Sequence, residues 1–199
     1  MTNFIKFFCI FALIFTTTHG SLQASIEDDL TSFTQVMAND VLVIIKSQAS
    51  YNEKEKRLQA LFVKLVDIDW MAKFAVAKFW RTMSPANQNE YLKVYKNYLL
   101  KLYVPRFRDY NDQDLAISGI KSLGNSQFLI STDIIASDGV TKVNIQYRCK
   151  DEGGRNFKIR DIVAENISLI TTQRSEFSSI IEQGKIDDLI TILRNKVVQ

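Results

Sequence analysis

The first half of the chain carries apolar residues every three or four positions, which is the period of one helix face. On this pattern we predict four helices, at residues 26–46, 50–66, 70–79 and 84–103. Ser84-Pro85 is a strong start signal, because a capping hydroxyl precedes a proline at the first helical position. Asp67 and Asp69 interrupt the apolar pattern, and we expect both to lie at helix ends.

In the second half of the chain the period changes to two. Alternation of apolar and polar residues predicts half-buried strands at residues 115–121, 128–135, 143–150 and 157–163. Turns are expected at Ser137–Gly139 and Asp151–Gly154, because aspartate and glycine tolerate the left-handed backbone of hairpins. Helical spacing returns over 172–184 and 189–193. The chain is therefore predicted to be one α+β domain, with N-terminal helices, a curved antiparallel sheet and C-terminal helices.

Residues 1–24 have the pattern of a secretory signal peptide. Lys6 gives the N-terminal region a positive charge, and Phe7–Phe15 is an unbroken apolar run. Leu22–Ala24 has small or aliphatic residues at the positions that signal peptidase recognises. The apolar run is too short to span a bilayer, which takes about 20 residues. We expect cleavage after Ala24, export, and a single mature domain of residues 25–199. The alternative interpretation is an uncleaved membrane anchor.

Composition narrows the chemistry that the mature chain can perform. The formal net charge of +3, from 25 basic and 22 acidic residues, gives no electrostatic case for nucleic-acid binding. Cleavage removes His19 and Cys9, which leaves no histidine and only Cys149. This excludes a Ser-His-Asp or Cys-His nucleophile, a histidine-based zinc site and an internal disulfide. We expect no metal, no cofactor and no enzymatic activity.

Aromatic residues are concentrated in the third and fourth predicted helices. Periodicity favours a packed core, because aromatic side chains dominate buried area. The alternative is that these rings line a hollow between the helices and the sheet that accepts an apolar ligand. The pattern by itself does not separate a filled core from a lined cavity.

Charged residues allow two further interpretations. Asp161 is in phase with the apolar face of its predicted strand, so we expect a buried carboxylate. A structural role is favoured over acid–base catalysis, because no second group is positioned to share the chemistry. Basic residues near the predicted element ends are interpreted as solvated surface, with contact to phosphate head groups or a membrane-bound partner as the alternative.

Several segments, taken in order, resemble one known family. They are residues 66–74 (VDIDWMAKF), 78–81 (KFWR), 84–88 (SPANQ), 143–148 (VNIQYR), 157–162 (FKIRDI) and the tail 168–177 with Gly184 and 188–190. No single segment is specific, but their order and spacing from about Ile26 to Leu193 are similar to the MlaC family, the toluene-tolerance auxiliary component of an ABC transporter.

The resemblance implies a fold and a function. The fold would be helices wrapped on a curved sheet, a cone of the nuclear-transport-factor or cystatin kind, enclosing an apolar cavity. The function would be that of a monomeric periplasmic carrier in Gram-negative bacteria. It would shuttle phospholipid between an inner-membrane ABC transporter complex and an outer-membrane lipoprotein–porin complex, and so maintain outer-membrane lipid asymmetry.

On this interpretation, two sets of side chains are candidates for the site. Those expected to line the cavity are Phe74, Phe79, Trp80, Tyr95, Leu99, Leu102, Tyr103, Phe128, Ile130, Val143, Ile145, Tyr147 and Val163. Those expected to contact the head group or a partner are Lys78, Arg81, Arg106 and Arg148.

The chain departs from the family pattern at three places. The family has Leu-Gly-Lys where this chain has Val76-Ala77-Lys78, glycine where it has Asn166, and commonly tryptophan where it has Phe157. We expect these changes to alter the shape of the cavity. Two other functions stay open: an exported isomerase or hydrolase that uses Asp161, and a non-catalytic adaptor of transporter subunits.

Overall fold

The computed structural model describes residues 19–109, 114–136, 139 and 142–198. In chain order its elements are α1 (His19–Lys46), α2 (Tyr51–Leu65), α3 (Ile68–Val76), the 3-10 helix η1 (Ala77–Thr82), α4 (Pro85–Tyr103), the 3-10 helix η2 (Val104–Asp109), β1 (Asp114–Gly124), β2 (Gln127–Ile135), β3 (Lys142–Asp151), β4 (Phe157–Ala164), β5 (Ile167–Ser168), α5 (Leu169–Gln183) and α6 (Ile186–Val198). The predicted α+β class is confirmed.

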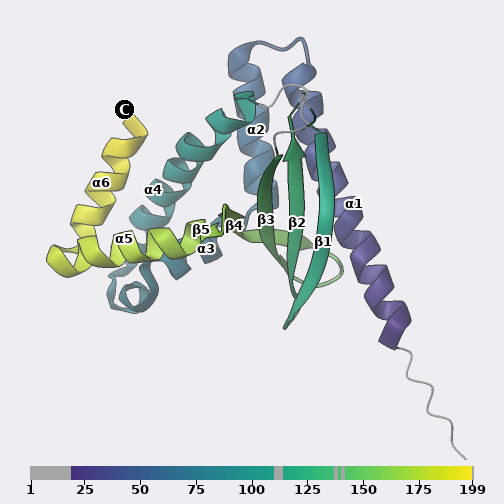
Figure 1. The fold of residues 1–199 in the computed structure, drawn as a ribbon. Coiled ribbons are helices and arrows are strands. Elements are labelled where there is room, and N and C mark those ends of the chain that lie inside the picture. Colours follow the sequence, from purple (N-terminus) through teal and green to yellow (C-terminus); the bar gives the residue numbers. More distant parts are fainter. Residues whose placement is uncertain (1–18, 110–113, 137–138, 140–141, 199) are drawn as a thin grey trace, which may run out of the picture.

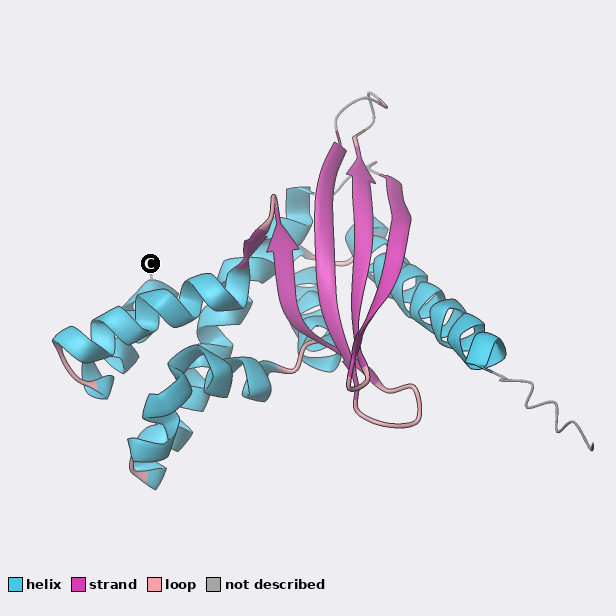
Figure 2. Cartoon of the chain, turned by 60° about the horizontal axis from the view of Figure 1, so that its bottom comes forward, coloured by secondary structure: helices cyan, strands magenta, loops and turns pink. Residues whose placement is uncertain are grey.

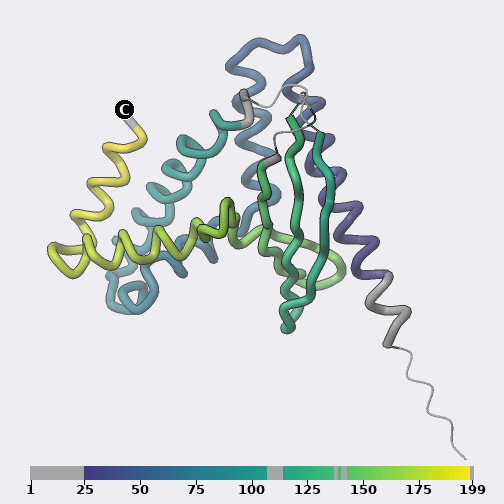
Figure 3. Tube along the Cα trace, viewed as in Figure 1, coloured from purple at the N-terminus to yellow at the C-terminus, as the bar shows by residue number. Residues whose placement is uncertain are grey.

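The strands form one antiparallel sheet in the order β1-β2-β3-β4-β5. α1 and α2 lie against one face of this sheet (Figure 1). Helices α3 to α6 gather beside the β4 edge, away from β1, which Figure 2 shows from another side. The chain leaves the sheet through α5 and returns along α6 beside α4 (Figure 3). The molecule therefore has a sheet half and a helical half.

Side-chain caps start the helices where the sequence placed polar residues. Ser50, Asp67, Ser84 and Ser168 each accept a hydrogen bond from the backbone N–H three residues ahead, at 3.2–3.3 Å. Each bond satisfies one of the orphan N–H groups of a first helical turn. The start signal at Ser84-Pro85 is confirmed, as is the position of Asp67 at a helix end.

The helix α1 begins at His19, seven residues before the predicted start, and passes Ala24 without interruption. Residues 1–18 lie outside the described part of the chain, so cleavage after Ala24 stays a prediction. The expected turn at Ser137–Gly139 also falls largely outside it. Among the helices that the structure describes, none combines the length and the apolar character needed to cross a bilayer.

The predicted helix 70–79 ends early, and Ala77 is the reason. α3 stops at Val76, and Ala77 has φ 47° and ψ −117° before the chain continues as η1. A side chain with a Cβ is strained in this left-handed region, which glycine adopts freely. The chain therefore makes this turn with an alanine and carries the strain.

Each half has its own aromatic cluster within one continuous hydrophobic core. In the sheet half, the Phe157 ring packs against Phe33 of α1 at 5.7 Å and edge-on against Phe128 of β2 at 6.3 Å. In the helical half, Tyr95 of α4 packs 5.6 Å from Tyr91 and 6.2 Å from Phe177 of α5. The buried hydroxyl of Tyr91 donates to the Ala72 carbonyl oxygen at 2.9 Å, which also fixes α3 to α4.

The middle of β4 joins the two halves. The backbone N–H of Asp67 donates to the Ile159 carbonyl oxygen at 2.9 Å, and Arg160 forms an ion pair with the Asp67 carboxylate at 2.9 Å. On the next residue, Asp161 accepts from the backbone N–H of Ile170 at 3.1 Å and from the Ser168 hydroxyl at 2.7 Å. Consecutive residues of one strand therefore fix the starts of α3 and α5.

A β-bulge at this point reverses the alternation of β4. Cys149 of β3 pairs with Ile159, but the preceding Arg148 pairs with Asp161, so one extra residue of β4 is accommodated. Residues that face each other across a ladder share a face of the sheet, and a one-residue shift therefore exchanges the faces. After the bulge, Ile162 therefore lies on the inner face of the sheet. Simple alternation had assigned that face to Asp161 and Val163.

The strain at Ala77 predicts that Ala77→Gly stabilises the protein. Relief of the strained conformation is worth about 1–3 kcal/mol, against about 0.4–1 kcal/mol of added unfolded-state entropy. We expect a net gain of about 1 kcal/mol in the free energy of unfolding, measured by urea denaturation. Ala60→Gly on the exposed side of α2 is the control and should cost about 1 kcal/mol. Equal losses in both variants would contradict the assignment.

Buried phenols and a buried thiol predict loss of stability at alkaline pH. Burial raises the pKa of Tyr91 and Tyr95 well above its usual range and the pKa of Cys149 to about 12. Well below pH 9 these groups are protonated in both states. The unfolded chain loses the Cys149 proton around pH 9 and the tyrosine protons around pH 10, whereas the native state retains them. Above its unfolded pKa, each such group therefore lowers stability by about 1.4 kcal/mol per pH unit. Urea midpoints between pH 8 and 11 test this, and midpoints that stay constant to pH 11 would contradict it. Tyr91→Phe, although less stable, should show a shallower decline.

Candidate functional site

An apolar cavity of about 610 Å³ lies between the sheet, the helices α1 and α2, and the start of α5. Its volume is in the range of roughly 300–1,000 Å³ that ligand pockets occupy. The residues that line it are Met37, Ala38, Val41, Leu58, Leu61, Phe62, Leu65, Val66, Tyr103, Arg106, Leu115, Ile134, Ile145, Tyr147, Ile159, Ile162, Ala164, Glu165, Ile167, Leu169 and Thr172.

The sheet face is divided between packed core and cavity. Phe128 and Ile130, in the first half of β2, are buried in the core with Phe157, whereas Ile134 near the end of the same strand lines the cavity. In β3 the order is reversed, because the strand is antiparallel: Ile145 lines the cavity and Cys149 is buried below it. One end of the sheet is thus closed by aromatic rings and the other end is hollow.

On the helical side, most of the cavity wall comes from the apolar stripes of α1 and α2. α1 presents Met37 and Val41, one turn apart, and α2 presents Leu58 and Phe62 in the same relation. The ring of Phe62 stacks on Tyr103, the last residue of α4, at 6.2 Å with the planes only 4° apart. This stack connects the helical half to the cavity wall.

The bulge in β4 decides which of its residues face the cavity. Val163, expected on the inner face in phase with Phe157 and Ile159, is not among the lining residues. Ile162 and Ala164 line the cavity instead, because the bulge lies between Ile159 and Asp161. The expectation for Val163 is corrected on this ground.

Three of the predicted cavity residues line the cavity: Tyr103, Ile145 and Tyr147. Six others belong to the helical half, outside the cavity, and they are Phe74, Phe79, Trp80, Tyr95, Leu99 and Leu102. The reason is that α4 packs its aromatic face on α3, α5 and α6, so those rings fill a core. Phe128 and Ile130 are in the core of the sheet half, and Val143, 40% exposed, lies outside the cavity near the start of β3.

Aromatic residues of α3 and η1 form cation–π contacts instead of lining the cavity. Trp70 stacks on Phe74 at 4.9 Å. The Arg160 guanidinium lies 4.9 Å from the centre of the Trp70 ring, and the Arg174 guanidinium lies 4.9 Å from that of Phe74. The result is a ladder of four side chains that ties β4, α3 and α5 together. Trp80 of η1 also packs against a ring of the helical half, with its ring centre 6.5 Å from that of Tyr91.

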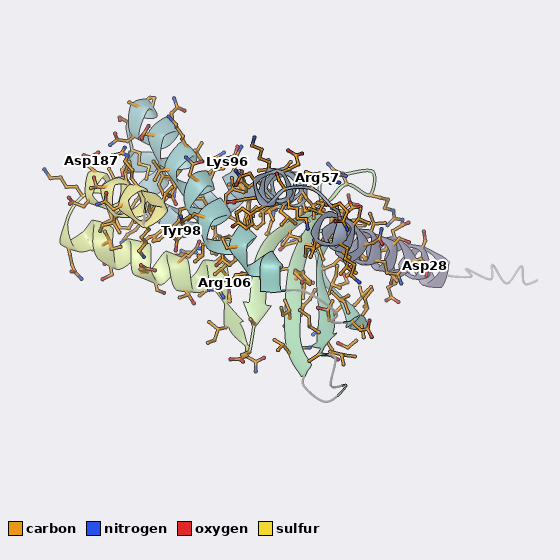
Figure 4. All side chains as sticks on the ribbon, turned by 90° about the horizontal axis from the view of Figure 1, so that it is seen from above. Asp28, Arg57, Lys96, Tyr98, Arg106 and Asp187 are labelled. Atoms are coloured by element: carbon orange, nitrogen blue, oxygen red, sulfur yellow. The ribbon has the colours of Figure 1, made fainter. Side chains whose placement is uncertain are left out.

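Of the predicted basic contacts, Arg106 of η2 lines the cavity. Seen from above, it lies near the middle of the molecule, with Asp28 and Asp187 towards the two far ends (Figure 4). Lys78 is outside the cavity and forms an ion pair with Glu182 at 3.0 Å. Arg81 in η1 and Arg148 on β3 are exposed, and neither lines the cavity.

Sequence reasoning missed most of the cavity wall. The stripe of Leu58, Leu61, Phe62 and Leu65 was visible as an apolar helix face, but periodicity gives no sign that a hollow rather than a core faces it. Glu165 and Ile167 were missed because the two-residue strand β5 is too short for alternation to show.

The cavity offers little chemistry. Its lining is apolar apart from the side chains of Arg106, Glu165 and Thr172 and two tyrosine hydroxyls. Within the described residues, no three His, Cys, Asp or Glu side chains lie close enough together to bind a metal ion. Asp161 is 2% exposed, and its two oxygens accept the hydrogen bonds that hold the start of α5. This arrangement supports the structural role predicted for the carboxylate.

The fold and the site define an α+β protein that encloses an apolar pocket beside an antiparallel sheet. The family model of the MlaC protein matches residues 35–195. The chain belongs to the MlaC family, and the resemblance seen in the sequence is confirmed.

Two relatives extend this result. The intermembrane phospholipid transport system binding protein MlaC of Haemophilus influenzae is 21% identical over 136 residues. That match covers 67% of this chain and 64% of the Haemophilus protein, a little under two thirds of its length. A phospholipid-binding protein from Ralstonia solanacearum, solved in complex with a phospholipid, shares the fold with a TM-score of 0.73 at 18% identity, over 84% of this chain and 96% of that one.

The position of Asp161 predicts a large stability effect. Asp161→Ala leaves the Ile170 N–H without its acceptor inside the protein, a loss of about 1–3 kcal/mol. Asp161→Asn keeps one acceptor oxygen and should lose less. Urea unfolding followed by tryptophan fluorescence measures both, with the exposed Asp28→Ala as the control, expected within about 0.5 kcal/mol of the wild type. If Asp161→Ala were as stable as this control, the anchoring role would be refuted.

Proposed function

We propose that this protein is a phospholipid carrier whose cavity holds acyl chains. The observation that carries the proposal is the apolar cavity of about 610 Å³ with its few polar side chains. Membership of the MlaC family supports it, as does the fold shared with a phospholipid-binding protein.

The energetics favour this use of a cavity. Burying one methylene gains about 0.8 kcal/mol, so two chains of about 16 carbons would need about 25 kcal/mol to cross water bare. A carrier has only to offer an interior as apolar as the bilayer. The free energy of moving a lipid from the bilayer into the cavity is then close to zero. The partners at each membrane can then set the direction. No covalent bond changes in this process, so the protein acts without catalysis.

The setting that we propose is the periplasm, where the protein would exchange lipid with an inner-membrane ABC transporter complex and an outer-membrane lipoprotein–porin complex. Lipid asymmetry of the outer membrane would depend on this exchange. The predicted signal peptide at residues 1–24 and the family support this setting. An adaptor that only docked subunits would have no use for a cavity, and a hydrolase built on Asp161 would need a carboxylate that is already engaged at α5.

Lipid extraction tests the proposal. The natively purified protein, extracted with organic solvent and analysed by mass spectrometry, should yield about one phospholipid per chain. Ile145→Trp should place an indole ring in the part of the cavity that two or three methylene groups of the lipid would occupy. This costs about 2 kcal/mol of lipid binding, a loss of roughly thirtyfold.

The matched control lies one residue along the same strand. Gln146→Trp adds the same ring on the opposite face of β3 and should keep its lipid, because side chains alternate across a strand. A wild-type protein that carries no phospholipid contradicts the proposal. Equal lipid content in the two tryptophan variants does so as well.

A further inference from the structure

The outer sides of α2 and α4 carry a cluster of positive charges. The chain has no acidic residue at positions 56–66 or at positions 91–108, and these two stretches take in most of both helices. The exposed basic side chains of the two helices in these stretches are Lys56, Arg57, Lys64, Lys93, Lys96 and Lys101. We call this set the α2–α4 basic face.

The two helices present these charges on one side of the molecule. A groove of about 320 Å³ has Val63 of α2 and Lys96 of α4 in its lining. In Figure 4, Arg57 and Lys96 lie along the same edge of the molecule. The opposite faces of the helices are buried, since Leu58 of α2 lines the cavity and Tyr95 of α4 belongs to the core. The basic side chains are therefore held outward on a rigid support.

The positive charges of this face are not neutralised by the protein. Among the described residues, none forms an ion pair with any of the six side chains. Two acids that line the groove, Asp67 and Glu152, are bound by Arg160 at 2.9 and 2.6 Å. Asp69 is the remaining acid of the lining, and Lys158 adds a further positive charge there. Although the whole chain has a net charge of only +3, this side is strongly basic.

The composition of the face favours a membrane surface over a protein partner. Five of its six charges are lysines, which are depleted at protein interfaces because the ammonium is strongly hydrated and its stem is flexible. The apolar centre of a protein interface is also missing. The large apolar side chains exposed on the two helices are Tyr51, at the start of α2, and Val63. An anionic lipid surface requires no such centre, since it attracts lysine and arginine through charge.

We propose that the α2–α4 basic face binds the surface of an anionic phospholipid membrane. Each lysine or arginine close to such a surface strengthens binding about fivefold. This interaction goes beyond the carrier function, because none of the six residues is among those that line the cavity. It also places the cavity close to the membrane. α2 turns the basic face outward and Leu58 and Phe62 inward, so a single helix, about 10 Å thick, separates the lipid surface from the cavity.

Sedimentation with lipid vesicles tests the inference. The natively purified protein is mixed with vesicles of dioleoylphosphatidylcholine, either alone or with about one third dioleoylphosphatidylglycerol, and the protein in the pellet is measured. We expect binding to the anionic vesicles at about 0.05 M salt and loss of most of it at about 0.5 M salt, where the charges are screened.

Two double variants locate the contact. Lys93→Gln combined with Lys96→Gln on α4 should lower binding to the anionic vesicles about tenfold to thirtyfold, and so should Lys56→Gln combined with Arg57→Gln on α2. Both variants should keep the phospholipid content of the wild type, because the cavity wall is unchanged.

Lys121→Gln combined with Lys185→Gln is the matched control. Both lysines are exposed, one on β1 and the other just before α6, so the same two charges are removed elsewhere and binding should stay close to that of the wild type. Equal binding of the wild type to neutral and anionic vesicles overturns the inference and leaves an acidic protein surface as the partner. A control variant that binds as weakly as the α4 variant also overturns it, since net charge then decides. The phospholipid extracted from the purified protein tests the carrier function separately.

Discussion

An apolar hollow persists in a protein only where its walls are rigid, because the atoms that line it have lost packing partners and would otherwise close in. Here two aromatic clusters within one hydrophobic core supply the rigidity. The rings of Phe33, Phe128 and Phe157 close one end of the sheet, and Tyr91, Tyr95 and Phe177 fill the helical half. Neither cluster can move into the cavity without losing these ring contacts.

Polar groups reinforce the joint between the sheet half and the helical half. Arg160 reaches the Asp67 carboxylate and the face of Trp70, and Asp161 holds the first turn of α5. Asp67 and Asp161 each have two roles. Each binds the first turn of a helix, and each also fixes the position of that helix against the sheet. The β-bulge beside them makes this possible, because it turns Asp161 away from the cavity face and brings Ile162 onto it. The position of the hollow and the position of the helical half thus depend on one irregularity in β4.

Two departures from the family pattern have a common physical basis. Ala77 and Asn166, two of the places where the sequence departs from the expected family pattern, both have positive φ. Asparagine tolerates the left-handed region, so the turn beside Glu165 keeps its shape at little cost. Alanine has no such tolerance at φ 47°, and the break between α3 and η1 is held by its surroundings. A glycine position can therefore be filled differently while the backbone that it shaped is retained.

Periodicity and capping residues were enough to predict the helices, the four long strands and the α+β class, since these depend on local spacing and on single side chains such as Ser84. The sequence by itself also predicted that Asp161 is buried, although simple alternation placed it on the cavity face, from which the bulge turns it away. Only the tertiary structure decided which apolar faces meet a hollow and which meet each other. Leu58 and Tyr95 follow the same helical rule, yet one lines the cavity and the other fills a core, because the difference lies in what packs opposite them. The bulge had no signal in the pattern either, since it follows from the pairing of β4 with β3 and from the helices that Asp161 must reach.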